Sequence, residues 1–285
     1  MSESKNVRGT AFVIAEFRAE ENEETAPLYT DKIVRLFLND ETRRVADEIA
    51  QTFPPAKEMI KLRTRYFDDV LSNQIGLGYK QVVILGSGLD TRAARKNAEG
   101  VSYFEIDDGA TLQLKEESLK KNKITATVRY IPGDYVKDNL VSLLIQNHFN
   151  FEIPTYFLWE GNTTLLAKED VIFVLKQIRN NVKEFRLSLD YMSNKVISRT
   201  TGYQDINDYI DKYESLYTPW VTGFDNIEPL AKELGFKVIE NFSTAELYKV
   251  YRPNRTLESN LFKFYFVCTL ESLSKRNNRT IQQNN

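Results

Sequence analysis

The arrangement of apolar and polar residues changes near residue 80. Before that point, apolar positions recur at helical spacing, which predicts helices over 31–38 and 41–53 and another after Pro54-Pro55 that reaches about residue 71. From residue 81, short β-branched or aromatic runs alternate with longer amphipathic segments. That alternation is typical of strands separated by helices.

The second part of the chain predicts an α/β sheet. Strands separated by single helices form right-handed βαβ units, so we expect a doubly wound, mostly parallel, Rossmann-like sheet with helices on both faces. The run Val82-Val83-Ile84-Leu85 is apolar throughout, as expected for a strand that is buried on both faces. The strands are expected at 81–85, 101–106, 127–131, 155–159 and 185–191, and the helices at 91–97, 109–121, 136–146 and 168–182.

The pattern also suggests how the chain is organised. Residues 1–75 are predicted to form an N-terminal helical extension and residues 76–273 the main α/β domain. Within that domain, residues 193–222 are rich in Tyr, Asp, Asn and Thr and have no clear period, so we interpret them as an insertion or lid after the fifth strand. A helix at 227–234 and strands at 237–241 and 261–270 follow, and the polar tail 274–285 is expected to be flexible.

Composition excludes several classes of protein. The 285 residues include 42% hydrophobic and 27% charged residues, which is ordinary globular usage. With 38 Lys and Arg against 40 Asp and Glu, the net charge is −2, which argues against a nucleic-acid partner. One cysteine and no Cys/His cluster predict neither a disulfide nor a metal site. Apolar runs reach only about five residues, so we expect no membrane span and a cytoplasmic protein.

The most specific motif is a Gly-Ser-Gly turn at residues 86–88, directly after the first strand. Glycines there permit a tight turn and a close approach of a ligand to the backbone. The second strand ends in Glu105 and Asp107, and an acid at that place can accept hydrogen bonds from a ribose diol. Strand alternation puts both acids on one side, so only the geometry of the strand end decides between them. We favour Asp107.

The third glycine of the dinucleotide fingerprint is missing, because position 91 holds Thr91. This favours a nucleoside ligand that has no pyrophosphate. S-adenosylmethionine is the commonest such ligand for this architecture, and a turn without any ligand is the alternative.

Several separated segments form a recognisable set of motifs: 84–92 and 103–107, together with 15–18, 27–29, 63–69, 133–134 and 158–161. These motifs together resemble the leucine carboxyl methyltransferase superfamily, in particular its bacterial branch of S-adenosylmethionine-dependent O-methyltransferases. The resemblance spans roughly residues 10–270. It implies methyl transfer from S-adenosylmethionine to a carboxylate or hydroxyl oxygen.

The resemblance implies roles for residues around the first two strands. Gly86 and Gly88 would let the backbone approach the methionyl part of the cofactor, and Asp107 would bind the ribose hydroxyls. Arg63 or Arg65 could hold the methionyl carboxylate bidentately. Because residues two apart on a helix point to different faces, only one of the two should bind, and the family pattern favours Arg63.

Three further residues follow the third and fourth strands. By the resemblance, Asp134 would accept a hydrogen bond from the adenine amino group while Tyr135 covers the ring. The alternative for Asp134 is a Gly-Asp turn that caps the next helix. Glu160 would lie near the amino group of the cofactor. Its apolar neighbours indicate a low dielectric, so we expect a cationic partner beside it.

The acceptor is less defined by the sequence. The N-terminal helices and residues 193–222 should surround it, with Tyr191, Tyr203, Tyr217 and Trp220 as candidate lining residues. It could be a small molecule or a peptide C-terminus. The sole histidine, His148, is expected at the surface, and no catalytic residue is assigned. The alternatives are a nicotinamide-dependent oxidoreductase on the same fold and a cofactor-binding protein without transferase activity.

Overall fold

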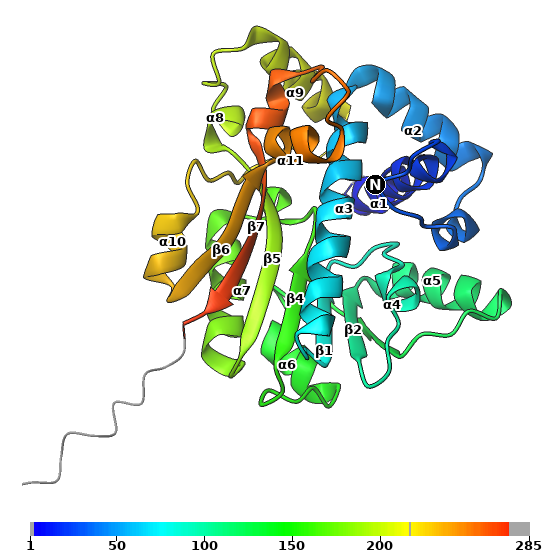
Figure 1. The fold of residues 1–285 in the computed structure, drawn as a ribbon, viewed down its shortest axis with the longest axis vertical. Helices are drawn as coiled ribbons and strands as arrows, with labels where there is room; N and C mark the ends of the chain where they lie inside the picture. Colours follow the sequence, from blue (N-terminus) through cyan, green and yellow to red (C-terminus); the bar gives the residue numbers. More distant parts are fainter. Residues whose placement is uncertain (1–2, 217, 274–285) are drawn as a thin grey trace, which may run out of the picture.

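Seven strands of the described chain form one sheet. The structure is a computed structural model that describes residues 3–216 and 218–273. The strands are β1 (Gln81–Leu85), β2 (Ser102–Asp107), β3 (Val128–Pro132), β4 (Thr155–Trp159), β5 (Phe185–Met192), β6 (Phe236–Ser243) and β7 (Tyr265–Ser272). Their order is β3-β2-β1-β4-β5-β7-β6 (Figure 1). Neighbours from β3 to β5 are parallel, whereas β7 runs antiparallel to both β5 and β6. The predicted Rossmann-like fold class is confirmed.

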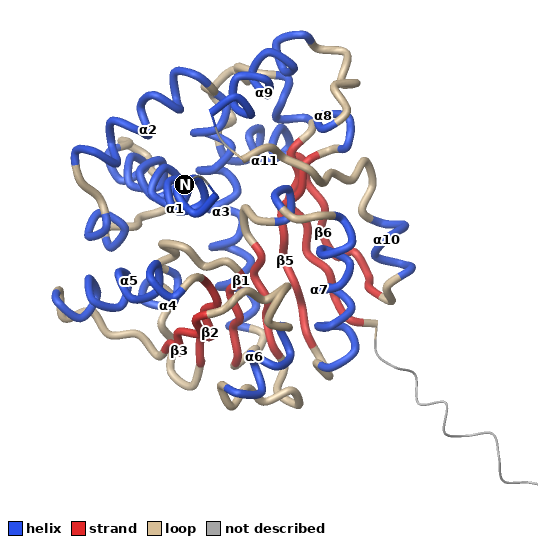
Figure 2. The backbone as a smooth tube through the Cα atoms, turned by 180° about the vertical axis from the view of Figure 1, so that it is seen from behind, coloured by secondary structure: helices blue, strands red, loops and turns tan. Residues whose placement is uncertain are grey.

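Helices cover both faces of this sheet and the end where the parallel strands finish. The α-helices are α1 (Glu3–Glu20), α2 (Asp40–Thr52), α3 (Pro55–Gly76), α4 (Arg92–Arg95), α5 (Gly109–Lys121), α6 (Leu140–Gln146), α7 (Lys168–Asn181), α8 (Asn194–Ile197), α9 (Gln204–Leu216), α10 (Glu228–Glu233) and α11 (Thr244–Tyr251). Short 3-10 helices are η1 (Glu21–Glu23), η2 (Ile33–Phe37), η3 (Thr163–Leu165) and η4 (Asn260–Lys263). Helices α3 and α11 lie on one face, and α6, α7 and α10 lie on the other (Figure 2).

The alternation of side chains in β1 divides the core into two layers. Val82 and Ile84 pack into the cluster under α3, whereas Val83 and Leu85 pack into the cluster under α6 and α7. All five residues of the strand are buried, including the polar Gln81 at its start, whose Nε2 donates to the Asn150 carbonyl oxygen at 2.8 Å. Because the remaining four residues face two cores in alternation, all four are apolar, and this explains why the run shows no polar alternation.

Helices α1 and α2 lie beyond the carboxyl ends of the parallel strands (Figure 1). Helix α2 begins with a capping box in which the Asn39 side chain accepts from the Thr42 backbone N–H at 3.0 Å. Helix α3 begins at Pro55, where a missing backbone N–H costs nothing, and runs the full height of the sheet. These helices bring residues from the first quarter of the chain over the glycine turn.

Several predicted elements differ in detail. The helix expected over 31–38 is the 3-10 helix η2, because the Asp31 side chain accepts from the Val34 backbone N–H and tightens the turn. The helix expected over 136–146 starts only at Leu140, after Asn139 with φ +65°. Helix α9 lies within 193–222, where no period was visible, and η4 takes the start of the strand expected at 261–270.

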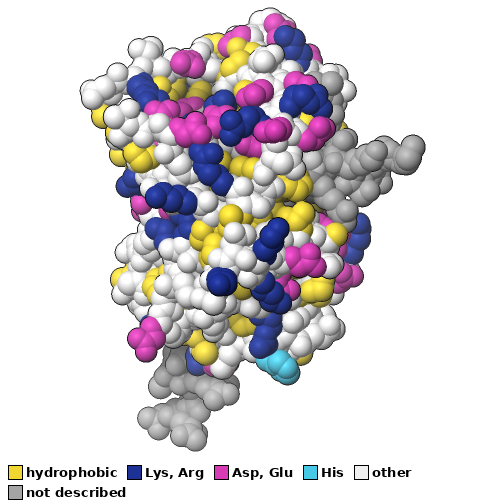
Figure 3. All heavy atoms as spheres, turned by 90° about the vertical axis from the view of Figure 1, so that its right-hand side faces the viewer, with side chains coloured by type: hydrophobic (Ala, Val, Ile, Leu, Met, Phe, Trp, Pro, Cys, Tyr) yellow, Lys and Arg dark blue, Asp and Glu magenta, His cyan; other side chains and the backbone are white. Residues whose placement is uncertain are grey.

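The surface mixes charges of both signs. Figure 3 shows Lys and Arg interleaved with Asp and Glu on one side of the molecule, most densely over its upper part. In the described residues, no helix has both the length and the apolar character needed to cross a bilayer. His148 is exposed, as the sequence predicted, and Cys268 is fully buried in β7.

Candidate active site

The glycine turn connects β1 to α4 and forms the base of a cavity. Gly86 and Gly88 have φ values of +61° and +46°, a region that only glycine adopts without strain. A Cβ atom on Gly86 would lie 2.5 Å from Nδ2 of Asn162. We call the hollow above it the glycine-turn cavity. The residues that line it are Thr10, Ala11, Ile14, Arg18, Arg63, Ile84, Gly86, Ser87, Gly88, Leu89, Asp90, Asp107, Asp108, Thr111, Glu160, Gly161, Asn162 and Leu165.

Asp107 lies at the edge of this cavity because β2 ends beside β1. Its Oδ2 accepts from the Gly88 backbone N–H at 2.6 Å, and its Oδ1 accepts from the Asp108 backbone N–H at 2.7 Å. Burial raises the pKa of Asp107, and these two hydrogen bonds oppose that rise. Glu105 is fully buried in an ion pair with Lys115 and is absent from the described lining of the cavity. The geometry therefore separates the two acids, and Asp107 faces the cavity.

Arg63 reaches the cavity from α3. Its Nε donates to Oε1 of Glu160 at 2.9 Å, and its Nη1 donates to Oδ2 of Asp190 at 3.2 Å and to the Tyr265 hydroxyl at 2.5 Å. Arg65 points away, with a side chain 36% exposed that pairs with Asp69 one helical turn later. The two arginines thus occupy different helix faces, as predicted, and Arg63 is the one that lines the cavity.

A buried network of ion pairs supports the site from behind. Glu160 Oε2 accepts from Nη1 of Arg92 at 2.7 Å, so this acid has cationic partners on both sides. Arg92 also pairs with Asp68 at 2.7 Å and with Asp90 at 2.5 Å. The expected cation beside Glu160 is therefore present. The network fixes the carboxylate between α3 and the loop after β1.

Asp134 and Tyr135 lie elsewhere. Oδ1 of Asp134 accepts from the backbone N–H groups of Val136 and Lys137 at 3.0 and 3.1 Å, which is the geometry of a capping turn. The Tyr135 hydroxyl accepts from Nε1 of Trp159 at 3.0 Å, and the two rings pack edge to face. Neither residue is among the described residues that line the glycine-turn cavity. Their contact with adenine stays a prediction.

A second hollow adjoins the first. We call it the aromatic cavity. The residues that line it are Thr10, Val13, Ile14, Phe17, Ile49, Phe53, Ala56, Met59, Ile60, Arg63, Gly161, Thr164, Leu165, Asp190, Met192, Tyr213, Trp220 and Tyr265. Of the predicted acceptor-lining residues, Trp220 lies in this wall. Tyr191 instead bonds Asn241, Tyr203 packs on Phe264, and Tyr217 lies outside the described residues.

Asp190 and Tyr265 are the site residues that sequence reasoning missed. Asp190 accepts from the Gly161 backbone N–H through Oδ1 at 2.6 Å and from the Tyr265 hydroxyl through Oδ2. Burial raises the pKa of both side chains, and Arg63 opposes that rise. Asp190 had a detectable signal, because it ends a polar stripe along one face of the buried strand β5. Tyr265 had none, since its place depends on the antiparallel pairing of β7.

Solved structures share this architecture. A protein of the DUF574 family from Streptomyces avermitilis superposes with a TM-score of 0.63 at 11% identity, over 91% of this chain and 97% of that one. Magnesium protoporphyrin IX methyltransferase (ChlM) from Synechocystis, crystallised with SAH, gives a TM-score of 0.50 at 9% identity, over 90% and 93%. The fold of the chain is therefore a Rossmann-like fold that also occurs in solved methyltransferase structures.

Comparison with sequence relatives identifies the family of this chain. A protein of Streptomyces coelicolor is 29% identical over 68% of this chain and 72% of its own length, and one of Mycobacteroides abscessus is 30% identical over 58% and 60%. Each is named "Putative S-adenosyl-L-methionine-dependent methyltransferase". The model of the family described as leucine carboxyl methyltransferase matches residues 11–179. The chain belongs to the leucine carboxyl methyltransferase family. The predicted family and its cofactor, S-adenosylmethionine, are confirmed.

Proposed function

We propose that this protein transfers the methyl group of S-adenosylmethionine to an oxygen atom, either carboxylate or hydroxyl, of an acceptor bound in the aromatic cavity. The observation that carries this proposal is the charge around the glycine-turn cavity. Four acids line it (Asp90, Asp107, Asp108 and Glu160) against two arginines. Even with Arg92 behind them counted, acids exceed arginines, which favours a ligand with net positive charge.

The lining residues fit the parts of this cofactor. Asp107 offers carboxylate oxygens to the two ribose hydroxyl groups, and the acid of Glu160 suits an ammonium group. Arg63 offers a guanidinium to the carboxylate of the methionyl part. Gly86 and Gly88 leave the backbone uncovered between these side chains, so that the ligand can approach it closely.

When bound, S-adenosylmethionine supplies a methyl group already activated by its positively charged sulfur. The residues of the chain then hold the acceptor oxygen in line with the methyl group and keep water out. Orientation of this kind contributes roughly 7–11 kcal/mol to a reaction barrier. Arg63 lines both cavities, so it can fix the relative position of cofactor and acceptor.

The same charge distribution disfavours a nicotinamide-dependent oxidoreductase. A pyrophosphate would face an excess of carboxylates. It would also meet Thr91 where the dinucleotide fingerprint has glycine, and the Thr91 hydroxyl is held by Asp31 at 2.7 Å and by Arg18 at 3.0 Å. A binding protein without transferase activity remains the second candidate, since the same cavity serves both functions.

Calorimetric titration of the purified protein with S-adenosylhomocysteine and with NADH tests the proposal. We expect binding of the first and none of the second. Asp107→Ala should weaken binding roughly 10- to 100-fold, because hydrogen bonds to a charged group each contribute about 1.5–3 kcal/mol. Asp47→Ala, which removes an exposed aspartate of α2, is the control and should change nothing.

A third variant, Asp134→Ala, tests the predicted adenine contact separately. Unchanged affinity in Asp134→Ala would restrict cofactor binding to the residues that line the glycine-turn cavity. Tight binding of NADH, or full affinity in Asp107→Ala, would contradict the proposal.

A further inference from the structure

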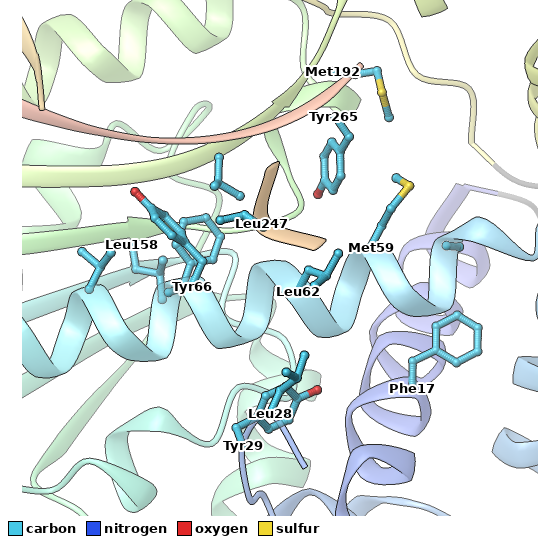
Figure 4. Packing of buried hydrophobic residues seen from close by; sticks show 14 of the residues in the cluster. Phe17, Leu28, Tyr29, Met59, Leu62, Tyr66, Leu158, Met192, Leu247 and Tyr265 are labelled. Carbon is cyan, nitrogen blue, oxygen red and sulfur yellow. The ribbon is translucent and has the colours of Figure 1, made fainter. Parts of the chain in front are cut away.

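The aromatic cavity shares one wall with the glycine-turn cavity. Thr10, Ile14, Arg63, Gly161 and Leu165 line both hollows, so an acceptor in one reaches the edge of the other. Beyond this shared wall the lining is mainly apolar. In Figure 4, Met59 on α3 and Met192 at the end of β5 point toward each other beside the ring of Tyr265.

One side of the aromatic cavity consists of three rings. The centroids of Tyr213 and Trp220 are 4.9 Å apart, and Phe53 lies 6.0 Å from each of them, with its ring tilted or edge-on. Aromatic side chains in such offset arrangements offer large flat apolar surfaces. The wall therefore suits an acceptor that is itself a ring or a compact apolar group.

The polar groups of this cavity gather at the shared wall and are already paired. Among its described lining residues, the charged ones are Arg63 and Asp190. The Arg63 guanidinium bonds Glu160, Asp190 and the Tyr265 hydroxyl, so its charge is opposed by two carboxylates. An anionic acceptor would be brought against Asp190 without a cation of its own, and such an arrangement is costly in a buried site.

A neutral hydroxyl group on the acceptor, by contrast, would find a hydrogen-bond partner in this cavity. The Tyr265 hydroxyl donates to Asp190 and accepts from Arg63, and its oxygen can accept one more hydrogen bond. Burial raises the pKa of Asp190 above its ordinary value, which makes its carboxylate a better proton acceptor near neutral pH. Tyr265 and Asp190 together thus provide a route for a proton that leaves the acceptor.

Resting on the proposed function, we propose that the acceptor is a neutral, largely apolar compound with a ring-borne hydroxyl group, and that Tyr265 relays its proton to Asp190. The acceptor oxygen forms the new bond to the methyl carbon as the carbon–sulfur bond breaks, and that electron pair stays on sulfur. The acceptor proton passes to the Tyr265 oxygen while the Tyr265 proton passes to Asp190. The products are a methyl ether, a neutral thioether and a protonated Asp190.

A matched pair of probes tests this choice. We would titrate 2-naphthol and 2-naphthoate into the full chain loaded with S-adenosylhomocysteine, at pH 7, where the phenol is neutral and the acid is anionic. We expect 2-naphthol to bind at least about tenfold more tightly, a difference of about 1.4 kcal/mol. With S-adenosylmethionine, mass spectrometry should detect the methyl ether and no methyl ester.

Substitutions connect binding to the residues involved. Tyr265→Phe and Asp190→Asn should each lower kcat on 2-naphthol by about 10²- to 10⁴-fold, the usual contribution of a positioned base, with S-adenosylhomocysteine affinity unchanged in Tyr265→Phe. Tyr191→Phe is the matched control, because its hydroxyl is also buried and bonded but lines neither cavity. Ala56→Phe should fill the aromatic cavity and abolish 2-naphthol binding, whereas S-adenosylhomocysteine should still bind.

The results separate the two proposals. Failure of S-adenosylhomocysteine to bind would overturn the proposed function and this inference with it. Normal cofactor binding with 2-naphthoate bound as tightly as 2-naphthol, or with neither bound, would overturn the inference alone. Full kcat in Tyr265→Phe would also overturn it.

Discussion

Arg92 provides the sharpest test of how the site is held together. Its guanidinium is 2% exposed and bonds three carboxylates, those of Asp68, Asp90 and Glu160. In Arg92→Met, Asp68 keeps Arg95 at 2.6 Å and Glu160 keeps its second arginine at 2.9 Å, but Asp90 loses its direct partner. A buried charge stripped of its partner costs about 3–5 kcal/mol, and this is the loss of stability that we expect.

The control is an arginine with the same kind of partners at the surface. Arg44 on α2 pairs with Glu41 and Glu48 at 3.1 and 2.7 Å, and its side chain is 60% exposed. Because exposed pairs contribute little, Arg44→Met should leave the urea midpoint where it is. Urea unfolding followed by circular dichroism gives both values, and adding Asp90→Asn to Arg92→Met should recover part of the loss. Equal midpoints for Arg92→Met and Arg44→Met would refute the reasoning.

Three further predictions concern the carboxyl group of Asp68, the glycine at position 86 and the thiol of Cys268. Burial raises the pKa of Asp68, but the two buried arginines beside it outweigh that effect and hold the pKa well below its ordinary range. Its contribution to stability is therefore present above its unfolded pKa of about 3.9 and lost as the pH falls toward the folded value. Asp68→Asn should flatten the dependence of the urea midpoint on pH between about 5 and 3, and an unchanged slope would contradict this assignment. Gly86→Ala and Gly100→Ala both place a Cβ atom at positive φ, which costs roughly 1–2 kcal/mol of stability in each variant. Only the new Cβ at position 86 also meets the Asn162 side chain in the cavity. Calorimetry should therefore show weaker S-adenosylhomocysteine binding in Gly86→Ala and unchanged binding in Gly100→Ala. Cys268 is fully buried and burial raises the pKa of its thiol, so a thiol-specific reagent should react only at the rate of unfolding; rapid labelling of the native protein would disprove that.

The parts of the fold that depend on local pattern could be predicted from the sequence. The run Val82–Leu85 identifies a doubly buried strand by itself, and Gly86 with Gly88 identifies the turn after it. Asp107 followed from its position at the end of the next strand. Each of these signals lies within a few residues, so no knowledge of distant pairing was needed.

The parts that depend on distant pairing could not be predicted. Tyr265 enters the site because β7 inserts antiparallel between β5 and β6, and no local feature specifies that register. Arg92 follows the glycine turn directly, yet its partners include Asp68, 24 residues earlier, and Glu160, 68 residues later. Helix α9 was missed although its apolar residues Ile206, Ile210 and Tyr213 recur at helical spacing, because most of the residues between them are polar.

The two cavities share a wall but extend into different parts of the chain. The described lining of the glycine-turn cavity ends at Leu165, whereas the aromatic cavity also includes Asp190, Met192, Tyr213, Trp220 and Tyr265. The family model matches residues 11–179, so all five of these residues lie beyond the matched segment. Substitutions in the C-terminal third can therefore reshape the aromatic cavity while the lining of the glycine-turn cavity keeps its residues.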